Sequence, residues 1–313
     1  MKKKKRRVRP GRLLIVVLVL LALIGASVTV LIKVIGPSDD GYVFDKNSLS
    51  INEFDYSEMK MLDIDLYSNA YMLIRLNDFH VLYGKNINSR IYPASLTKIV
   101  TMDTVLNNVN DLSDTSSYTY DDYYELIDAN ASVAGLEINE EYPIRELLYA
   151  LVLPSGADAG RALENYFKAH GRDLVEEMNV LVNRLGLEDS HFTNTAGLHD
   201  DDLYTCLDDY ARIVVDTLLN DDGKAVLKCF RYELEDGTVL RSTLESLNDI
   251  GNVTVYGGKT GFTGEAGENI MVLYSHDDRS YLLILAGAPG NPYAGQLYHF
   301  NDVNNIIEYL YNN

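Results

Sequence analysis

Cysteine is scarce in this sequence of 313 residues, which contains only Cys206 and Cys229. Two cysteines are too few for a disulfide framework, and their spacing matches no zinc-binding pattern. We expect either two small buried hydrophobic side chains or a single bridge between them. The sequence also lacks internal repeats, and its only low-complexity tract is a basic stretch at the start. A disulfide-stapled scaffold is therefore excluded.

Positive charge is also scarce beyond the first twelve residues. The formal net charge is -19, and the opening MKKKKRRVRPGR contains eight Lys or Arg and no acid. Removing those eight charges from -19 leaves -27 on residues 13–313. Such an acidic body repels nucleic acid and anionic membrane surfaces, so the basic head does not indicate DNA binding. We expect no nucleic-acid partner.

One hydrophobic run, LLIVVLVLLALIGASVTVLI at residues 13–32, is long enough to cross a membrane. A transmembrane helix needs about twenty such residues. The alternative is a signal peptide cleaved near residues 25–27, which would give a secreted protein, but the apolar region of a signal is usually only about 7–15 residues long. We therefore expect a cytoplasmic head at 1–12 and a single-pass anchor at 13–35. The positive-inside rule then places the remainder outside the cell membrane.

The rest of the chain predicts one domain at residues 70–313, preceded by an acidic juxtamembrane linker at 36–69 that has no sustained apolar period. Two apolar runs around Asn77-Asp78 predict a hairpin. A helix is expected to begin at Ser95, with Ile99, Met102 and Leu106 on its apolar stripe. Further helices are expected at residues 144–153, 157–171, 172–186, 207–221 and 298–311, and strands at 253–262, 269–276 and 280–288. Strands at both ends with helices between them predict an α/β or α+β class.

Ser95 and Lys98 form a Ser-x-x-Lys motif at the expected helix start. A serine there lies at the positive end of the helix dipole, and a lysine three residues later lies on the same face. If that amine is desolvated, its pKa falls and it can accept the serine proton. The alternative is a helix N-cap beside a solvated lysine. The spacing alone does not decide, because the linker holds a second example at Ser57 and Lys60.

Two later motifs each have a structural alternative. In LPSGADAG, Ser155 followed by Asp158 before a helical run is the pattern of a capping box. In GGKTGFTGEAG, Lys259, Thr260 and Gly261 end a strand pattern among glycines, where a ligand can approach the backbone. A surface turn would give the same tripeptide.

Taken together and in this order, the three motifs resemble those of penicillin-recognising serine enzymes. The sequence is similar to the low-molecular-mass penicillin-binding proteins, specifically the serine-type D-alanyl-D-alanine carboxypeptidases (peptidase S11-like). The resemblance covers about residues 70–313 and includes PASLTKIVT, ASVAGL, IRELLYALVLPSGADA, LGLEDSHFTNTAGLHD and KTGFTGEAG. It implies a β-lactamase/transpeptidase-like fold, with an antiparallel sheet from both termini, flanking helices and a helical subdomain.

The resemblance also implies roles. Ser95 would attack the D-Ala-D-Ala peptide bond of peptidoglycan stem peptides, with Lys98 as base and Ser155 relaying a proton to the leaving group. Lys259 and Thr260 would hold the terminal carboxylate. The peptide following Gly261 would place the N–H of Phe262 in an oxyanion hole with that of Ser95. β-Lactam antibiotics would act as inhibitors, and neither a metal nor an organic cofactor is called for.

Two departures from the family pattern concern substrate binding. Ala157 replaces the asparagine usual at the third position of the second motif. The stretch GAPGNPYAGQLYHF contains no arginine, and Gln296 lies roughly where the family often has one. Either loss predicts altered preference for a free terminal D-alanine. The alternatives within enzymes are a peptidoglycan endopeptidase and a β-lactamase-like hydrolase, the latter disfavoured because the sequence offers no second carboxylate base for deacylation. Ala157 also leaves open a catalytically weak wall-binding protein.

His191 and His199 lie in HFTNTAGLHDDD and invite the idea of a metal site. The resemblance instead places this segment on a structural loop, so no metal ligands are assigned to it.

Overall fold

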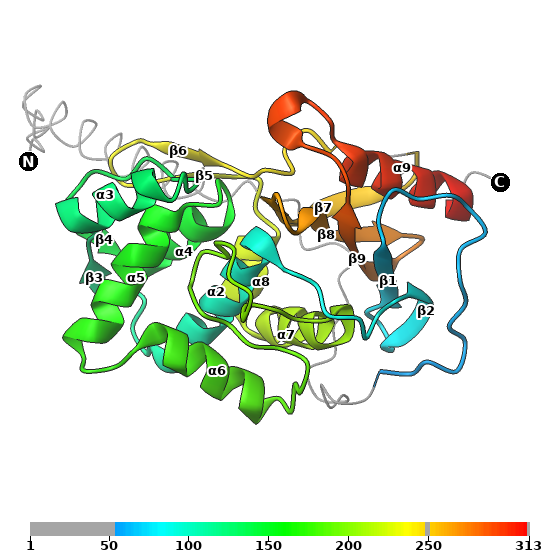
Figure 1. Ribbon diagram of the computed structural model, residues 1–313, viewed down its shortest axis with the longest axis horizontal. Coiled ribbons are helices and arrows are strands. Elements are labelled where there is room, and N and C mark those ends of the chain that lie inside the picture. The colour runs from blue at the N-terminus through cyan, green and yellow to red at the C-terminus, as the bar shows by residue number, and fades with distance from the viewer. Residues whose placement is uncertain (1–53, 248–250, 312–313) are drawn as a thin grey trace, which may run out of the picture. The chain divides into compact units, whose positions relative to one another are not determined.

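The central sheet is built from both ends of the domain, as the sequence predicts (Figure 1). The computed structural model describes residues 54–247 and 251–311. Five antiparallel strands lie in the order β2-β1-β9-β8-β7. Their bounds are β1 Ala70–Arg75, β2 His80–Lys85, β7 Thr254–Thr263, β8 Gly267–His276 and β9 Arg279–Ala288. Because β7 is an edge strand, one side of its backbone can meet another segment.

Helices cover both faces of this sheet. On one face α9 (Tyr298–Tyr311) buries Val303, Ile306 and Ile307 against strand residues, and its bounds are those predicted. The opposite face carries α7 (Leu207–Leu219) and α2 (Thr97–Asn108), whose apolar side chains join those of β1 and β9 in the larger core. The prediction of a sheet flanked by helices is confirmed.

A helical subdomain lies beside the sheet, at the left of Figure 1. Three of its helices were predicted and end within a few residues of the expected bounds: α4 Ile144–Val152, α5 Ala157–Ala169 and α6 Leu174–Arg184. Two helices that the sequence did not predict are α3 (Tyr120–Asp128) and α8 (Asp221–Leu227). Two short antiparallel pairs complete the fold: β3 Thr115–Ser116 with β4 Tyr142–Pro143, and β5 Arg231–Glu233 with β6 Val239–Arg241.

The expected linker at residues 36–69 needs correction at its C-terminal end. Residues from Phe54 onward pack on the domain, and the side chains of Phe54 and Leu62 are buried. Asp55 forms a β-bridge with His80, and residue 60 forms another with the same strand. The folded domain therefore begins before Ala70, because two apolar side chains anchor a segment whose composition is otherwise acidic.

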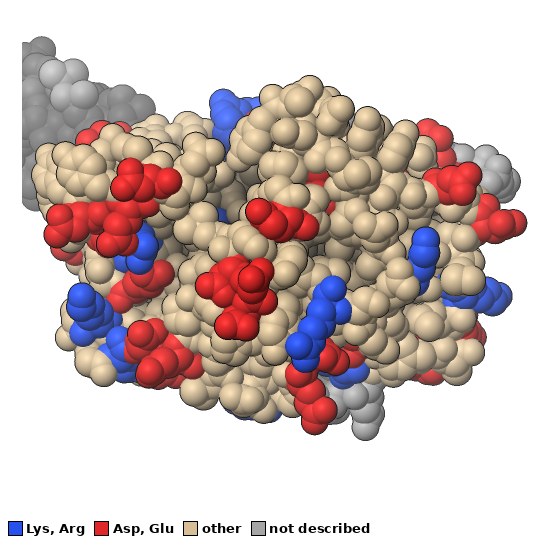
Figure 2. Space-filling view, viewed as in Figure 1, with Lys and Arg blue, Asp and Glu red and all other residues tan. Residues whose placement is uncertain are grey.

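The surface of the domain reflects its acidic composition. Figure 2 shows Asp and Glu side chains spread over the helical subdomain and the sheet side of the viewed face, with Lys and Arg between them. In the described part of the chain, no helix is long and apolar enough to span a membrane. The predicted head, the anchor and residues 36–53 of the linker lie outside the described residues.

Candidate active site

Ser95 lies in a tight turn that is braced by two glycines. The turn is the 3-10 helix η1 (Ala94–Leu96), which leads directly into α2. Ala94 has a left-handed φ of 49°. A Cβ on Gly197 would lie 1.8 Å from the carbonyl oxygen of Ala94, and one on Gly261 would lie 3.0 Å from the backbone nitrogen of Ser95. The segments on both sides of the serine therefore approach it more closely than any side chain would permit.

Lys98 is buried beside Ser95, which rules out the alternative of a solvated lysine. Its Nζ lies 3.1 Å from Ser95 Oγ and donates to the carbonyl oxygen of Ala196 at 2.6 Å. Burial lowers the pKa of Lys98 to about 7, against the opposing effect of the Asp158 carboxylate. A large share of this amine is therefore uncharged at neutral pH and able to accept a proton. Ser95 does not cap α2, because that helix has no side-chain cap at its start.

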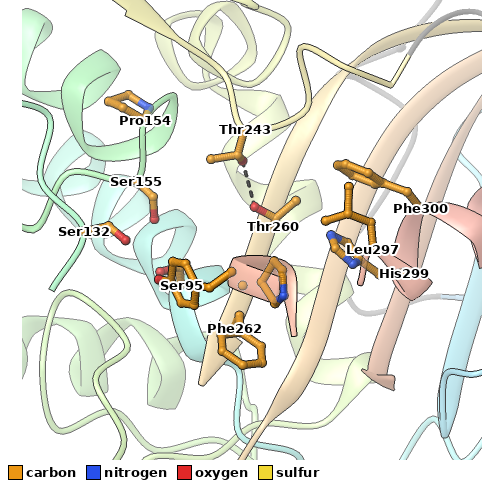
Figure 3. Close-up of a pocket in the computed structure, with 13 residues that line it drawn as sticks. Ser95, Ser132, Pro154, Ser155, Thr243, Thr260, Phe262, Leu297, His299 and Phe300 are labelled. Atoms are coloured by element: carbon orange, nitrogen blue, oxygen red, sulfur yellow. Dashed lines mark hydrogen bonds between the residues drawn. The ribbon is translucent and has the colours of Figure 1, made fainter. Parts of the chain in front are cut away.

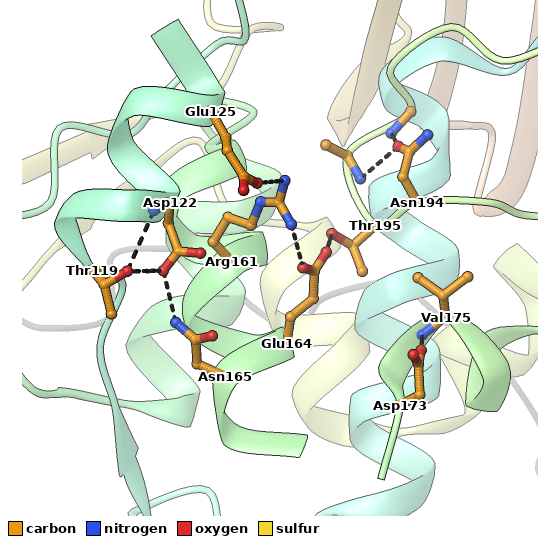
Figure 4. Close-up of polar contacts among 12 residues, drawn as sticks. Thr119, Asp122, Glu125, Arg161, Glu164, Asn165, Asp173, Val175, Asn194 and Thr195 are labelled. Atoms are coloured by element: carbon orange, nitrogen blue, oxygen red, sulfur yellow. Dashed lines mark hydrogen bonds and ion pairs between the residues drawn. The ribbon is translucent and has the colours of Figure 1, made fainter. Parts of the chain in front are cut away.

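The carbonyl that holds Lys98 belongs to the loop on which His191 and His199 were noted. Asn194 Oδ1 accepts hydrogen bonds from the backbone N–H groups of residues 196, 197 and 198. The Thr195 hydroxyl donates to Glu164 on α5, and Arg161 links Glu164 to Glu125 on α3 (Figure 4). Sequence reasoning missed this supporting role, which a backbone oxygen performs and no side-chain motif reports.

The capping box suggested for Ser155 and Asp158 is wrong. The start of α5 has no side-chain cap. Asp158 is fully buried, and its two oxygens accept from the backbone N–H groups of residues 134, 135 and 136. Ser155 has a left-handed φ of 67°, and its buried Oγ has no hydrogen-bond partner among the described residues. A strained serine with an unused hydroxyl is typical of a functional position.

The Lys-Thr-Gly segment occupies edge strand β7 beside η1. Lys259 is fully buried, and its Nζ donates to the carbonyl oxygen of Thr260 at 2.9 Å. Burial and the nearby charge of Lys98 hold the pKa of Lys259 well below its usual value. The Thr260 hydroxyl donates to that of Thr243 at 2.8 Å (Figure 3). Of the residues predicted to hold a carboxylate, Thr260 and not Lys259 faces open space.

Ser95 lies between two cavities. One, of about 250 Å³, extends toward α9, and the other, of about 300 Å³, extends toward α5 and the loop that follows α3. The first is lined by Ser95, Ser132, Pro154, Ser155, Thr243, Thr260, Gly261, Phe262, Pro292, Tyr293, Leu297, His299 and Phe300 (Figure 3). The structure thus gathers Ser95, Ser155, Thr260, Gly261 and Phe262 around one space.

The remaining predicted positions are placed as follows. Ala157 lines the second cavity together with Lys98 and His199, and Gln296 is exposed. Cys206 and Cys229 are both free thiols. No group of three His, Cys, Asp or Glu side chains suited to a metal ion occurs within residues 54–247 and 251–311.

Solved structures of the same shape define the fold class. The Streptomyces DD-transpeptidase superposes with a TM-score of 0.70 at 23% identity, covering 80% of this chain and 98% of that one. A D-alanyl-D-alanine carboxypeptidase from Mycobacterium tuberculosis gives 0.69 at 19% identity, covering 83% and 97%. The fold is therefore that of the DD-peptidases, which agrees with the predicted class.

The sequence then gives the family. The profile of the D-alanyl-D-alanine carboxypeptidase family, peptidase S11, matches residues 57–289, and the chain belongs to that family. The carboxypeptidase DacF of Bacillus subtilis is 30% identical over 207 residues, which are 64% of this chain and 52% of that protein. A Streptomyces carboxypeptidase is 28% identical over 221 residues, covering 67% and 72%. The chain thus spans about half the length of the Bacillus relative.

Proposed function

We propose that this protein is a serine D-Ala-D-Ala carboxypeptidase that removes the terminal D-alanine from peptidoglycan stem peptides. Family membership supports this reaction. The observation that carries it is the contact of 3.1 Å between Ser95 Oγ and a buried lysine amine whose pKa is lowered to about 7. That pair supplies a hydroxyl nucleophile and a base at neutral pH.

In the proposed acylation step the neutral Lys98 amine takes the proton of the Ser95 hydroxyl. The Oγ attacks the carbonyl carbon of the D-Ala-D-Ala bond, and the backbone N–H groups of Ser95 and Phe262 stabilise the oxyanion. Ser155, whose hydroxyl has no partner among the described residues, donates its proton to the leaving amine and regains one from Lys98, which returns to its neutral form. The C–N bond breaks, D-alanine departs, and an ester to Ser95 remains.

Deacylation runs through the same groups in reverse. A water molecule takes the place of the departed amine, Lys98 accepts its proton, and the hydroxide attacks the ester carbonyl. The bond to Ser95 Oγ breaks and the serine is reprotonated. In the proposed mechanism β-lactams acylate the same serine. They act as inhibitors because the ring-opened product stays attached to Ser95.

We place the domain outside the cell membrane, tethered by the anchor at residues 13–35. The uncharged run and the basic head before it support this topology. Alkaline extraction of membranes and protease treatment of intact spheroplasts test it. A protein that alkali releases, or that the protease cannot reach, contradicts the proposal.

Intact mass after incubation with benzylpenicillin tests the nucleophile. We expect an adduct of one penicillin on the full chain in detergent and none on the Ser95→Ala variant. An unmodified parent, or an adduct that persists on the variant, sinks the assignment. D-Alanine release from a pentapeptide, compared with cleavage of a cross-linked dimer, then separates the carboxypeptidase from the endopeptidase alternative.

A further inference from the structure

A buried carboxylate lies directly behind the wall of the cavity that extends toward α9. Glu268 of β8 pairs with Phe262 of β7, and Ile270 pairs with Thr260. Because cross-strand partners share a face of the sheet, Glu268 points to the α9 face beside Thr260 and Phe262. Its side chain is fully buried, and its Oε1 has no hydrogen-bond partner among the described residues.

Glu268 holds His299, the second residue of α9. Its Oε2 accepts from His299 Nδ1 at 2.8 Å and from the backbone N–H of His299 at 3.1 Å. A Cβ on Gly290 would lie 2.5 Å from the carboxylate carbon, so the β9–α9 connection leaves room for this acid only because residue 290 is glycine. Two hydrogen bonds and a glycine therefore fix the imidazole in one orientation.

His299 lines the cavity together with Thr260, Thr243 and Ser95 (Figure 3). With Nδ1 engaged by Glu268, the second ring nitrogen, Nε2, has no hydrogen-bond partner in the described part of the chain. The His299 side chain is 5% exposed and lines this cavity. A hydrogen bond from one ring nitrogen to a buried carboxylate commonly fixes the tautomer and the orientation of an imidazole in proteins.

The cavity otherwise presents hydroxyl groups and no fixed cation to a carboxylate. Gln296, at the position where an arginine was expected, is exposed and is not part of the lining. Lys259 is buried, with its amine on the carbonyl oxygen of Thr260. A substrate carboxylate placed at Thr260 thus meets hydroxyls from two threonines and the imidazole.

We propose that His299, as an imidazolium, binds the terminal carboxylate of the substrate, and that Glu268 is the positioning residue that holds it there. The inference rests on the proposed function, since it names the residue by which that site selects a free D-alanine terminus. The carboxylate accepts from Nε2–H and from the Thr260 hydroxyl, whose proton turns to it from Thr243.

Because Nδ1 donates to Glu268, Nε2 donates only in the protonated ring. Glu268 from β8 is the charged group that contacts the ring. Asp302, one turn later on α9, is held by Ser68 and the backbone N–H of residue 67. From β7 and α2, the buried amines of Lys259 and Lys98 lie toward the nucleophile. All ligands and variants are therefore compared at one pH, so that these two amines keep the same charge throughout.

Calorimetric binding tests the proposal without requiring turnover. The full chain carrying Ser95→Ala is titrated with diacetyl-L-Lys-D-Ala-D-Ala and with the C-terminal amide of the same peptide. We expect the acid to bind more tightly than the amide, and His299→Gln to reduce that ratio about ten- to a hundredfold, the range of a lost charge-assisted hydrogen bond.

Two further variants separate recognition from folding. Gln296→Ala, which changes an exposed side chain, is expected to leave the ratio at the parent value. Glu268→Gln, which keeps the size of the side chain but removes the charge that holds His299 Nδ1, is expected to reduce the ratio. An acid that binds no better than the amide, or a ratio that survives His299→Gln, overturns the inference. Absence of D-alanine release by the unaltered enzyme with the ratio behaving as expected refutes the proposed function alone.

Discussion

The lowered pKa of Lys98 makes a quantitative prediction about acylation of Ser95. If the neutral amine is the base, the second-order rate of acylation by benzylpenicillin follows the deprotonated fraction of Lys98. With a pKa of about 7, that fraction is about one tenth at pH 6, one half at pH 7 and nine tenths at pH 8. We therefore expect the rate to rise about fivefold from pH 6 to 7 and less than about twofold from pH 7 to 9.

The assay is stopped-flow or quenched mass spectrometry on the full chain, with circular dichroism at each pH as a control for folding. Asp158→Asn gives a second arm, because the Asp158 carboxylate favours the charged amine. Removing that charge lowers the pKa of Lys98 and moves the profile to lower pH. A rate that does not depend on pH between 6 and 9, or one that still rises steeply above pH 9, refutes the role of Lys98 as a neutral base.

Three other predictions concern the surroundings of the site. Gly197→Ala should reduce the rate of acylation at least about tenfold, because a Cβ would lie 1.8 Å from the carbonyl oxygen of Ala94. Gly171→Ala is the control: its φ of 71° is similar, but no atom lies near the added Cβ. That variant should lose only about 1 kcal/mol of stability and keep its activity. Ala157→Asn should raise D-alanine release about two- to tenfold if the restored amide donates to substrate, and an unchanged rate contradicts the view that Ala157 weakens binding. Burial and a neighbouring carboxylate raise the pKa of Asp103 well above 3.8, so this side chain keeps its proton in the folded state at a pH where it loses it in the unfolded state. The free energy of unfolding, measured with denaturant, should therefore fall as pH rises above 3.8. Asp103→Asn should reduce that fall.

The longest regular elements could be predicted from the sequence because one face of each is apolar. The helix at Tyr298–Tyr311 was predicted with its observed bounds, since Val303, Ile306 and Ile307 recur at the helical period. By contrast, α3 buries only Leu126 and exposes its tyrosines, so its sequence has no apolar stripe from which a helix could be predicted. The capping box formed by Thr119 and Asp122 stabilises its start instead.

The short helix α8 and the end of the linker were missed for a similar reason. The helix spans Asp221–Leu227, begins with two aspartates and contains a glycine, which are features of a loop. In the linker, Phe54 and Leu62 are the apolar anchors, but they are eight residues apart in an acidic stretch without a period. Contacts with distant parts of the chain determine the structure of both segments, and such contacts cannot be predicted from one sequence.

Within the site, the sequence motifs predicted which residues matter, and the structure shows which of them lie together. The motifs placed Ser95, Ser155 and Thr260 in one list, and all three line the same cavity. The capping box failed because Asp158 serves backbone N–H groups some twenty residues earlier in the chain, a contact that local spacing cannot show. The hydrogen bond from Lys98 to the carbonyl oxygen of Ala196 could not be predicted either, because every residue has a backbone carbonyl.

The departures at Ala157 and Gln296 leave the contact between Ser95 and Lys98 intact. Ser95 and Lys98 are fixed by one helical turn and by backbone contacts from two glycine-containing segments, which tolerate little change. The groups that we propose to contact the substrate, Thr260 on β7 and His299 on α9, come from separate elements. The domain is strongly acidic, yet at physiological ionic strength surface charge is screened beyond about 8 Å. We therefore expect recognition of a carboxylate to depend on donors inside the cavity, which His299 and Thr260 both line.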